Sequence, residues 1–313
     1  MSSKVYTFRI IVFILSLAAI STRKAPYRSL VAAQSIGNFG SIIQGVIVNG
    51  SIRTPWQWRN ITNNLGSDIN GITLADDEHS LTIAFTDRTG VLSADYYSFS
   101  IIATGLFNCH FSLILPSGKS MIYTDPLNRI YVVDLVTRQQ SILFDNIGET
   151  VGVRGLAYDS RNDWLYFSGI QIMRARSNGT QLQNVTRNLN LTYSNPGFQI
   201  TLDSYWNESN PRVYLAFNGG LYMANGDGTD EKLIHTTPIE SNYTGPYGVA
   251  VGEDALDGRR YIYWCRGLRS KEAYLERSLL TASGDLTTVE TLWVDTPSGE
   301  APWPYALELV PWI

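Results

Sequence analysis

The sequence has few of the residue types from which metal and catalytic sites are most often built. Its 313 residues include two cysteines and three histidines. Two cysteines exclude a disulfide-dense scaffold and a four-cysteine zinc site. His79, His110 and His235 lie far apart, and none belongs to a His-Glu-x-x-His motif. A Gly-x-Ser-x-Gly hydrolase motif is also absent, so we predict no catalytic residues.

Charged residues are scarce as well, and neither sign dominates. Charged residues make up 17% of the chain, and Lys+Arg 24 against Asp+Glu 28 gives a net charge of -4. This balance argues against a nucleic-acid partner. The apolar share of 44% is large enough to fill a core, which argues against a disordered chain.

Long hydrophobic runs are lacking except near the N-terminus. Ile10–Ile20 is apolar but spans only eleven residues, whereas a membrane-spanning helix needs roughly 20. The basic residues Lys4 and Arg9 precede this run, and the small residues Ser21 and Thr22 follow it. That order is typical of a secretory signal peptide. We therefore predict a cleaved signal peptide at residues 1–22, with an uncleaved membrane anchor as the alternative, and no transmembrane span in the mature chain.

Glycosylation sequons point to the same secretory route. Asn-X-Ser/Thr occurs without a middle proline at seven positions: Asn49, Asn60, Asn178, Asn184, Asn190, Asn207 and Asn242. Such sites carry carbohydrate on surface turns when they are modified. Together with the signal peptide, they predict a secreted, extracellular glycoprotein.

The rest of the chain repeats a short strand motif at intervals of 38 to 49 residues. It occurs at Ala84–Asp87, Ile122–Asp125, Tyr166–Gly169, Tyr214–Phe217 and Tyr263–Arg266. An apolar strand precedes each motif, and a β-prone run and a turn follow it. Four short strands per unit of roughly 40–45 residues indicate a β-propeller blade. One segment, Arg269–Arg277, departs from this pattern and predicts one or two helical turns inserted in a blade.

The two ends of the chain complete the blade count. Ala301–Val310 is similar to the first strand of a sixth unit, while the strand-like Ser29–Ala33 and Ser41–Val48 lack a first strand of their own. Joining them makes one blade from both termini and removes open sheet edges. We therefore predict an all-β, six-bladed propeller with four-stranded blades, one domain at about residues 25–313. Five or seven blades are the alternatives.

The third unit resembles a known family. Gly155–Asp159, Leu165–Ser168 and Asn178–Thr180 are similar to the low-density-lipoprotein-receptor class B repeat, which reads roughly Gly-Leu-Ala-Val-Asp, Leu-Tyr-Trp-Thr-Asp and Asp-Gly-Thr. The last Asp and the Trp of its second motif are kept in few units: Asp87, Asp125 and Trp264. The resemblance implies a six-bladed propeller. The receptors also carry cysteine-rich modules, which this chain lacks, and related six-bladed families include lactonases, so fold does not fix function.

The repeat also places the two cysteines. Cys109 belongs to the second unit and Cys265 to the fifth, which face each other across a six-bladed ring. A disulfide requires Cα atoms within about 7 Å. We therefore predict two thiols, whereas one disulfide would be usual in a secreted protein.

Candidate binding residues lie at the ends of the first strands. Tyr247, Trp303 and Tyr305 fall where two first strands begin, near one rim of the central channel. Exposed aromatics there would suit a peptide or sugar ligand, with core filling as the alternative. Three acids end first strands and are weak candidates for a calcium site in the channel: Asp76, Asp159 and Asp203. Their alternative role is to bridge blades or terminate strands.

These features favour one function over another. The leading hypothesis is a binding module that recognises an extracellular protein or glycan. The alternative is a secreted propeller hydrolase or lactonase with a divalent cation in its central channel, a function that needs six to eight converging oxygen ligands for calcium.

Overall fold

The structure is a computed structural model of residues 1–313. It describes residues 28–36, 39–45, 59–62, 69–74, 81–85, 88–92, 99–106, 108–147, 153–169, 171–188, 197–217, 219–237, 243–254, 257–268, 272–295 and 303–311, with side chains for most of those between 82 and 292. The predicted signal peptide lies outside these residues.

The described strands form six four-stranded antiparallel sheets. From the inner to the outer strand, the first three blades are β4 (Ile69–Leu74), β5 (Leu81–Phe85), β6 (Arg88–Leu92) and β7 (Phe99–Thr104); β8 (Ser112–Ile114), β9 (Ser120–Thr124), β10 (Ile130–Asp134) and β11 (Gln140–Phe144); and β12 (Gly155–Asp159), β13 (Trp164–Ser168), β14 (Ile172–Ala175) and β15 (Gln183–Asn184). The other three are β16 (Gly197–Asp203), β17 (Arg212–Phe217), β18 (Gly220–Asn225) and β19 (Lys232–Thr236); β20 (Tyr243–Glu253), β21 (Arg260–Leu268), β22 (Glu272–Leu280) and β23 (Leu286–Asp295); and β24 (Trp303–Pro311), β1 (Arg28–Ile36), β2 (Phe39–Gly45) and β3 (Arg59–Thr62).

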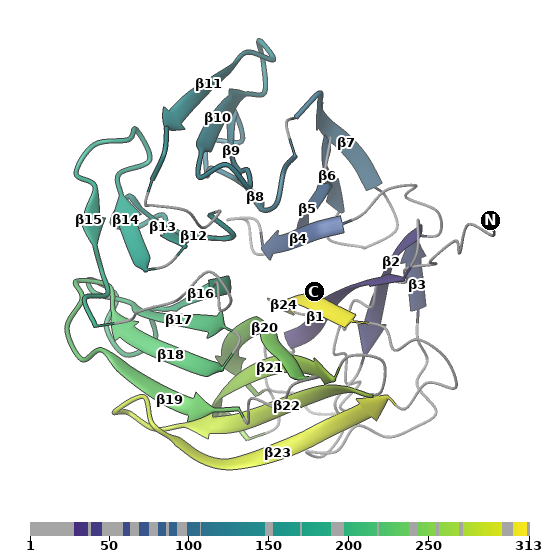
Figure 1. The fold of residues 1–313 in the computed structure, drawn as a ribbon, viewed down its shortest axis with the longest axis vertical. Helices are drawn as coiled ribbons and strands as arrows, with labels where there is room; N and C mark the ends of the chain where they lie inside the picture. Colours follow the sequence, from purple (N-terminus) through teal and green to yellow (C-terminus); the bar gives the residue numbers. More distant parts are fainter. Residues whose placement is uncertain are drawn as a thin grey trace, which may run out of the picture.

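The six sheets are arranged as the blades of a propeller. Their first strands β4, β8, β12, β16, β20 and β24 lie toward the centre, and each contacts the first strand of the next blade. The outer strands, such as β11, β15 and β23, lie at the periphery (Figure 1). The prediction of a six-bladed propeller with four-stranded blades is confirmed.

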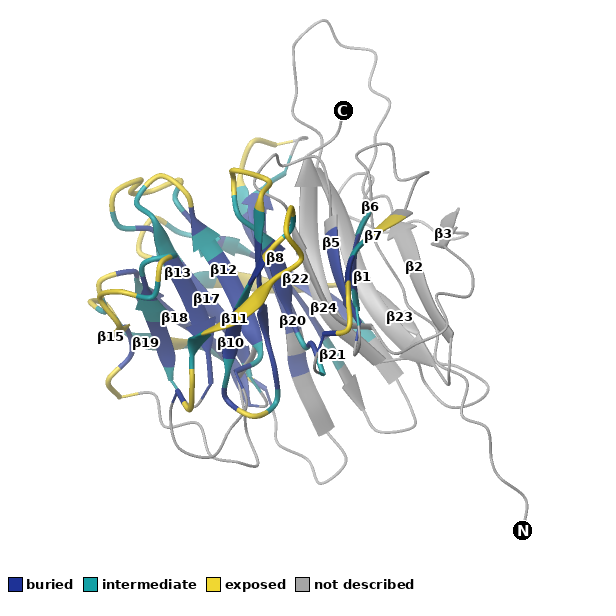
Figure 2. Ribbon diagram, turned by 90° about the horizontal axis from the view of Figure 1, so that it is seen from above, coloured by how far each residue is buried: buried dark blue, intermediate teal, exposed yellow. Residues whose placement is uncertain are grey.

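The repeated sequence motif forms the second strand of five blades, and its aromatic residues lie in the core. The largest fully buried side chains all come from second strands: Phe85, Tyr123, Tyr166, Phe167, Tyr214 and Trp264. Each such side chain contributes roughly 2 to 3 kcal/mol when it is removed from water. The core clusters combine residues of neighbouring blades, and Figure 2 shows the buried strands between exposed turns. The aromatic repeat therefore holds the blades to one another.

The aspartate that ends the motif in the second blade closes a turn. Asp125 is fully buried, and its Oδ1 accepts hydrogen bonds from the backbone N–H groups of Leu127 (2.8 Å) and Arg129 (3.0 Å). Its Oδ2 accepts one from the hydroxyl of Tyr131 at 3.2 Å. These hydrogen bonds connect the end of β9 to the turn and to β10, so the aspartate stabilises the hairpin from inside the blade.

The Asn-Gly and Asp-Gly turns adopt the backbone that their sequences favour. Gly179 and Gly228 have φ values of +84° and +87°, which glycine tolerates without steric cost. A Cβ atom on Gly228 would lie 2.3 Å from the carbonyl oxygen of Val185. This glycine therefore allows the fourth blade to approach the third.

The sixth blade joins the two ends of the chain. Strand β1 pairs antiparallel with β24, so that Ala32 lies opposite Leu307, and on its other side with β2, where Ala32 lies opposite Ile43. The predicted strands at Ser29–Ala33 and Ser41–Val48 differ from the observed ones by a few residues at their ends. The sheet is the one predicted from both termini.

The prediction of a helical segment at Arg269–Arg277 is wrong. Residues Glu272–Leu280 form strand β22, which pairs with β21 on one side and β23 on the other. The buried Glu276 accepts hydrogen bonds from Trp264 Nε1 (2.7 Å) and Arg266 NH2 (2.6 Å). Pairing on both sides, together with this charge pair, overrides the local preference of a charged, alanine-containing segment for helix.

Candidate binding surface

The antiparallel blades give the propeller two different faces. The first strands begin at one face, here called the start face, and end at the other, here called the end face. In an antiparallel blade, the hairpins between strands one and two and between strands three and four lie on the end face. Trp303 and Tyr305 lie in the first half of β24, and the described candidate acids Asp159 and Asp203 end β12 and β16 at the end face.

Two blades place a basic or titratable residue at the same position on the start face. The backbone N–H of His110 donates to the carbonyl of Thr124 at 2.8 Å, and that of Arg154 donates in the same way to Ser168 at 2.9 Å. Arg154 immediately precedes β12, and His110 lies two residues ahead of β8. Burial, together with the smaller effect of the positive charge of Arg154, lowers the pKa of His110 to about 4. The imidazole is therefore neutral at pH 7, close to a guanidinium.

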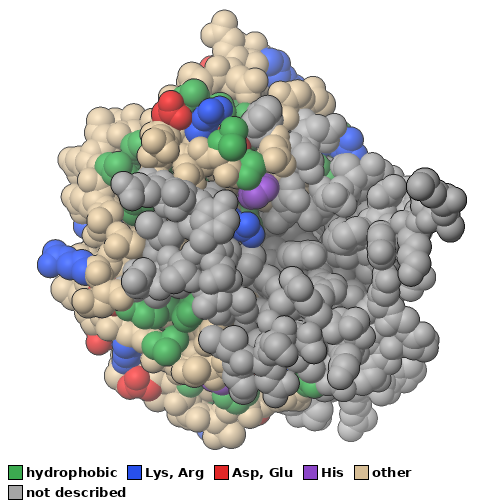
Figure 3. All heavy atoms as spheres, viewed as in Figure 1, with side chains coloured by type: hydrophobic (Ala, Val, Ile, Leu, Met, Phe, Trp, Pro, Cys, Tyr) green, Lys and Arg blue, Asp and Glu red, His purple; other side chains and the backbone are tan. Residues whose placement is uncertain are grey.

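Figure 3 shows a histidine next to a Lys or Arg side chain near the middle of the viewed face. Two nitrogen-bearing side chains thus lie close to the centre of the ring, where a partner would reach several blades at once. Propellers place binding residues on such loops around a rigid scaffold.

The three predicted rim residues lie within the first strands β20 and β24. Gly248 pairs with Cys265 as Gly155 pairs with Ser168, which puts Tyr247 of the fifth blade in the register of Arg154. Trp303 and Tyr305 lie in the first half of β24. The side chains of all three lie outside the described residues, so the structure gives their backbone position alone.

The two described acids on the end face have other partners. Asp159 accepts hydrogen bonds from the side-chain nitrogen of Asn162 at 2.7 Å and from its backbone N–H at 3.3 Å. Asp203 forms an ion pair with Arg260 of the fifth blade, and their side chains are 0% and 9% exposed. Both acids thus terminate a strand or bridge blades, which is the alternative that the sequence left open. Asp76 lies outside the described residues, and the described ranges hold no cluster of three metal-ligating side chains.

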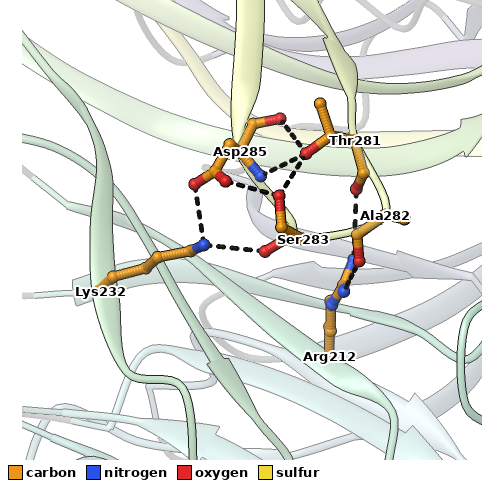
Figure 4. A network of polar contacts seen from close by, with 6 residues as sticks. All are labelled: Arg212, Lys232, Thr281, Ala282, Ser283 and Asp285. Atoms are coloured by element: carbon orange, nitrogen blue, oxygen red, sulfur yellow. Dashed lines mark hydrogen bonds and ion pairs between the residues drawn. The ribbon is translucent and has the colours of Figure 1, made fainter.

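A second polar contact fixes the fourth blade to the fifth on the end face (Figure 4). The Lys232 ammonium donates to the Ser283 carbonyl and pairs with the Asp285 carboxylate, both at 2.8 Å. Arg212 donates to the carbonyls of Thr281 and Ala282 in the same turn. Two cations of one blade therefore hold the β22–β23 turn of the next.

The end face also presents an aromatic pair that sequence reasoning missed. Tyr205 and Trp206, in the β16–β17 turn, are 55% and 38% exposed. Their ring centroids lie 4.9 Å apart with the planes at 88°. The sequence contains a signal, because two adjacent aromatic residues follow Asp203, the polar end of a first strand, after one serine. The repeat pattern predicts buried positions for aromatic residues, so it did not indicate that Tyr205 and Trp206 are exposed.

Both cysteines are buried thiols. The Cys109 sulfur donates to the carbonyl of Phe111 and contacts the Thr89 hydroxyl, each at 3.8 Å. The Cys265 sulfur donates to the carbonyl of Gly248 at 3.9 Å. Burial raises the pKa of Cys109 to about 12, so this thiol does not ionise at neutral pH.

Three of the seven sequons are described with their side chains. Asn178, Asn184 and Asn207 are exposed. Asn60 lies in β3, where the structure gives the backbone alone, and the remaining sequons lie outside the described residues: Asn49, Asn190 and Asn242.

Within the described ranges, no helix has the length and hydrophobicity needed to cross a membrane.

Comparison with known proteins identifies the fold. No protein family model matches the sequence, and no curated protein matches it. A chain in the crystal structure of a nidogen/laminin complex superposes with a TM-score of 0.68 at 15% identity, over 90% of this chain and 98% of its own. A putative TolB from Agrobacterium tumefaciens superposes with a TM-score of 0.53 at 13% identity, over 82% of this chain and 94% of its own. TolB from Acinetobacter baumannii superposes with a TM-score of 0.58 at 12% identity, over 90% of this chain and 66% of its own. At these identities the likeness concerns the fold alone: the chain is a β-propeller of the kind that its resemblance to the class B repeat implied.

Proposed function

We propose that this protein is a secreted glycoprotein whose propeller is a binding module for an extracellular protein or glycan. The order of charged, apolar and small residues at 1–22 supports export. The exposed sequons at Asn178, Asn184 and Asn207 support glycosylation. A chain of the same fold is seen in a nidogen/laminin complex, which supports recognition of a protein partner.

The observation that carries the proposal is the shared register of His110, Arg154 and Tyr247 on the start face. The backbone pairing of three blades gives these three chemically different residues equivalent positions relative to the second strands. A rigid surface binds without a large loss of conformational entropy on ordering. Arginine and tyrosine are also the residues that most often dominate binding energy.

The first experiment tests export. The full chain is expressed in cultured eukaryotic cells, and the secreted material is analysed by N-terminal sequencing and by mass before and after N-glycosidase treatment. We expect a mature N-terminus close to residue 23 and a mass that falls on deglycosylation. A chain that stays inside the cell without carbohydrate would refute the proposal.

The second experiment tests the start face with a matched pair of variants. Arg154→Gln and Arg161→Gln each remove one positive charge, but Arg161 lies on the end face, where it is 59% exposed and pairs with Glu208 at 2.6 Å. The glycosylated protein is screened against glycan arrays and extracellular proteins, and each hit is titrated with both variants. We expect Arg154→Gln to weaken binding about tenfold or more and Arg161→Gln to leave it unchanged. Equal affinities for the two variants would contradict a start-face site.

The same preparation tests the alternative function. Calcium that stays bound in stoichiometric amount after dialysis would favour a hydrolase or lactonase with a metal in the channel.

A further inference from the structure

The aromatic pair on the end face is held rigidly although it is exposed. The backbone N–H of Tyr205 donates to Asp203 Oδ1 at 3.0 Å. The guanidinium of Arg260, which is paired with the same aspartate, lies 4.5 Å from the centroid of the Tyr205 ring. Arg212 lies 5.5 Å from the centroid of Trp206. The rings are therefore preorganised, with half of the tyrosine and more than a third of the tryptophan still facing solvent.

The next residue in the chain is a sequon asparagine. Asn207 Oδ1 accepts hydrogen bonds from the backbone N–H and the hydroxyl of Ser209, at 3.1 and 2.8 Å, and from the backbone N–H of Asn210 at 3.2 Å. All three bonds use the amide oxygen and fix the side chain in a turn. The amide nitrogen, to which carbohydrate is attached in such a sequon, takes no part in them. A sugar on this nitrogen would begin within one or two residues of both rings.

Another sequon has the same turn without the aromatic residues. Asn178 Oδ1 accepts from the backbone N–H and the hydroxyl of Thr180, at 3.0 and 2.8 Å. Arginine and serine precede it in place of tyrosine and tryptophan. Trp164 in the same blade is already stacked by Arg174 and Arg176, whose guanidinium carbons lie 4.1 and 3.9 Å from its ring centroid. Asn178 is therefore a natural control for Asn207.

We propose that carbohydrate attached to Asn207 packs on the Tyr205–Trp206 pair and covers it. The C–H groups of a pyranose ring form an apolar surface, and contact with an aromatic ring removes apolar area of both from water. The Asn207 glycan then acts as part of the folded structure, whereas the glycan at Asn178 extends into solvent. This inference rests on the proposed glycoprotein and names the role of one of its glycans.

The test compares four variants of the secreted, glycosylated protein: Asn207→Gln, Asn178→Gln, Trp206→Ser and the double variant Asn207→Gln/Trp206→Ser. Mass spectrometry first establishes which sites carry carbohydrate, and thermal unfolding then gives Tm. We expect Asn207→Gln to lower Tm by roughly 3 °C more than Asn178→Gln. In the Trp206→Ser background the loss at Asn207 should shrink by at least half, because the sugar has lost its platform.

A second measurement separates the sugar from the turn. The same substitutions are made in unglycosylated protein, where Asn207→Gln and Asn178→Gln should lower Tm by similar amounts, since each removes the two or three hydrogen bonds of its turn. Equal losses at the two sites in the glycosylated protein, or an undiminished Asn207 effect without carbohydrate, would overturn the inference. A secreted protein glycosylated elsewhere but never at Asn207 would overturn it and leave the glycoprotein proposal standing. Absence of carbohydrate at every sequon would overturn both.

Discussion

The neutral histidine on the start face makes stability depend on pH in a defined window. The pKa of His110 falls from 6.5 in the unfolded chain to about 4 in the folded protein, because burial and Arg154 disfavour the charged imidazole. Between these two values the unfolded state binds the proton and the folded state does not. The contribution of the neutral His110 to the free energy of unfolding is therefore fully present above pH 6.5 and is lost as the pH falls toward 4.

The size of the effect follows from the two pKa values. At pH 5 the difference in proton binding removes about 2 kcal/mol of the free energy of unfolding, and at pH 7 almost none. The Asp carboxyls with lowered pKa values, such as Asp163 and Asp227, act only below their ordinary value of 3.8. Burial also lowers the pKa of His235, so its protonation likewise reduces the free energy of unfolding as the pH falls. Among the described groups with shifted pKa values named here, His110 and His235 therefore act in the window between pH 5 and 7.

Urea unfolding followed by tryptophan fluorescence measures this loss. The wild-type protein and His110→Gln are unfolded at pH 7 and at pH 5. A loss of about 2 kcal/mol lowers the wild-type midpoint by roughly 0.7 M more than that of His110→Gln, for a slope of about 3 kcal/mol/M. The variant keeps the contribution of His235, so the difference between the two proteins isolates His110. If both midpoints fall by the same amount between pH 7 and 5, the imidazole is not held neutral by its surroundings, and the account of the start face fails.

Three further predictions concern contacts within and between blades. Lys232→Met removes two bonds to the β22–β23 turn at a partly exposed site, so it should lower the free energy of unfolding by about 1 kcal/mol, measured by urea unfolding. Asp203→Ala leaves the guanidinium of Arg260 buried without its carboxylate and should cost about 3 to 5 kcal/mol by the same assay. The double variant Asp203→Ala/Arg260→Met should recover most of that loss, and no recovery would contradict the pairing. Maleimide should leave Cys109 and Cys265 unmodified in the native protein and add two labels after denaturation, as counted by mass; a native label would show an accessible thiol.

The blade repeat could be predicted from sequence because it reflects local packing. The motif at Tyr166–Gly169 predicted strand β13 at Trp164–Ser168, since alternating aromatic and small residues suit a strand buried between neighbours. The sixth blade was predictable for a similar reason, since an incomplete unit at each end leaves sheet edges to be joined. Strand β22 was not predictable in this way, because its stabilising contacts come from β21 and β23 rather than from its own pattern.

The positions of His110 and Arg154 on the start face could not be predicted from the strand pattern. His110 and Arg154 lie outside the repeated motif, one ahead of β8 and the other ahead of β12. Only backbone bonds to the second strand of each blade place them in register with Tyr247. The sequence therefore predicted this rim from its aromatic residues alone. The positions of the Arg154 guanidinium and the His110 imidazole became evident only from the structure.

The acids of the end face show how a distant partner decides the role of a correctly placed residue. Asp159 and Asp203 end first strands at equivalent positions, as the sequence indicated. A metal would need their carboxylates to converge. Instead, Asp203 is bound by Arg260, which lies 57 residues away in the next blade, while Asp159 is bound by Asn162 in its own turn. A buried carboxylate paired with arginine would lose that partner on binding calcium, and the uncompensated guanidinium would cost several kcal/mol. A calcium ion at Asp203 would therefore have to compete with the ion pair between the blades.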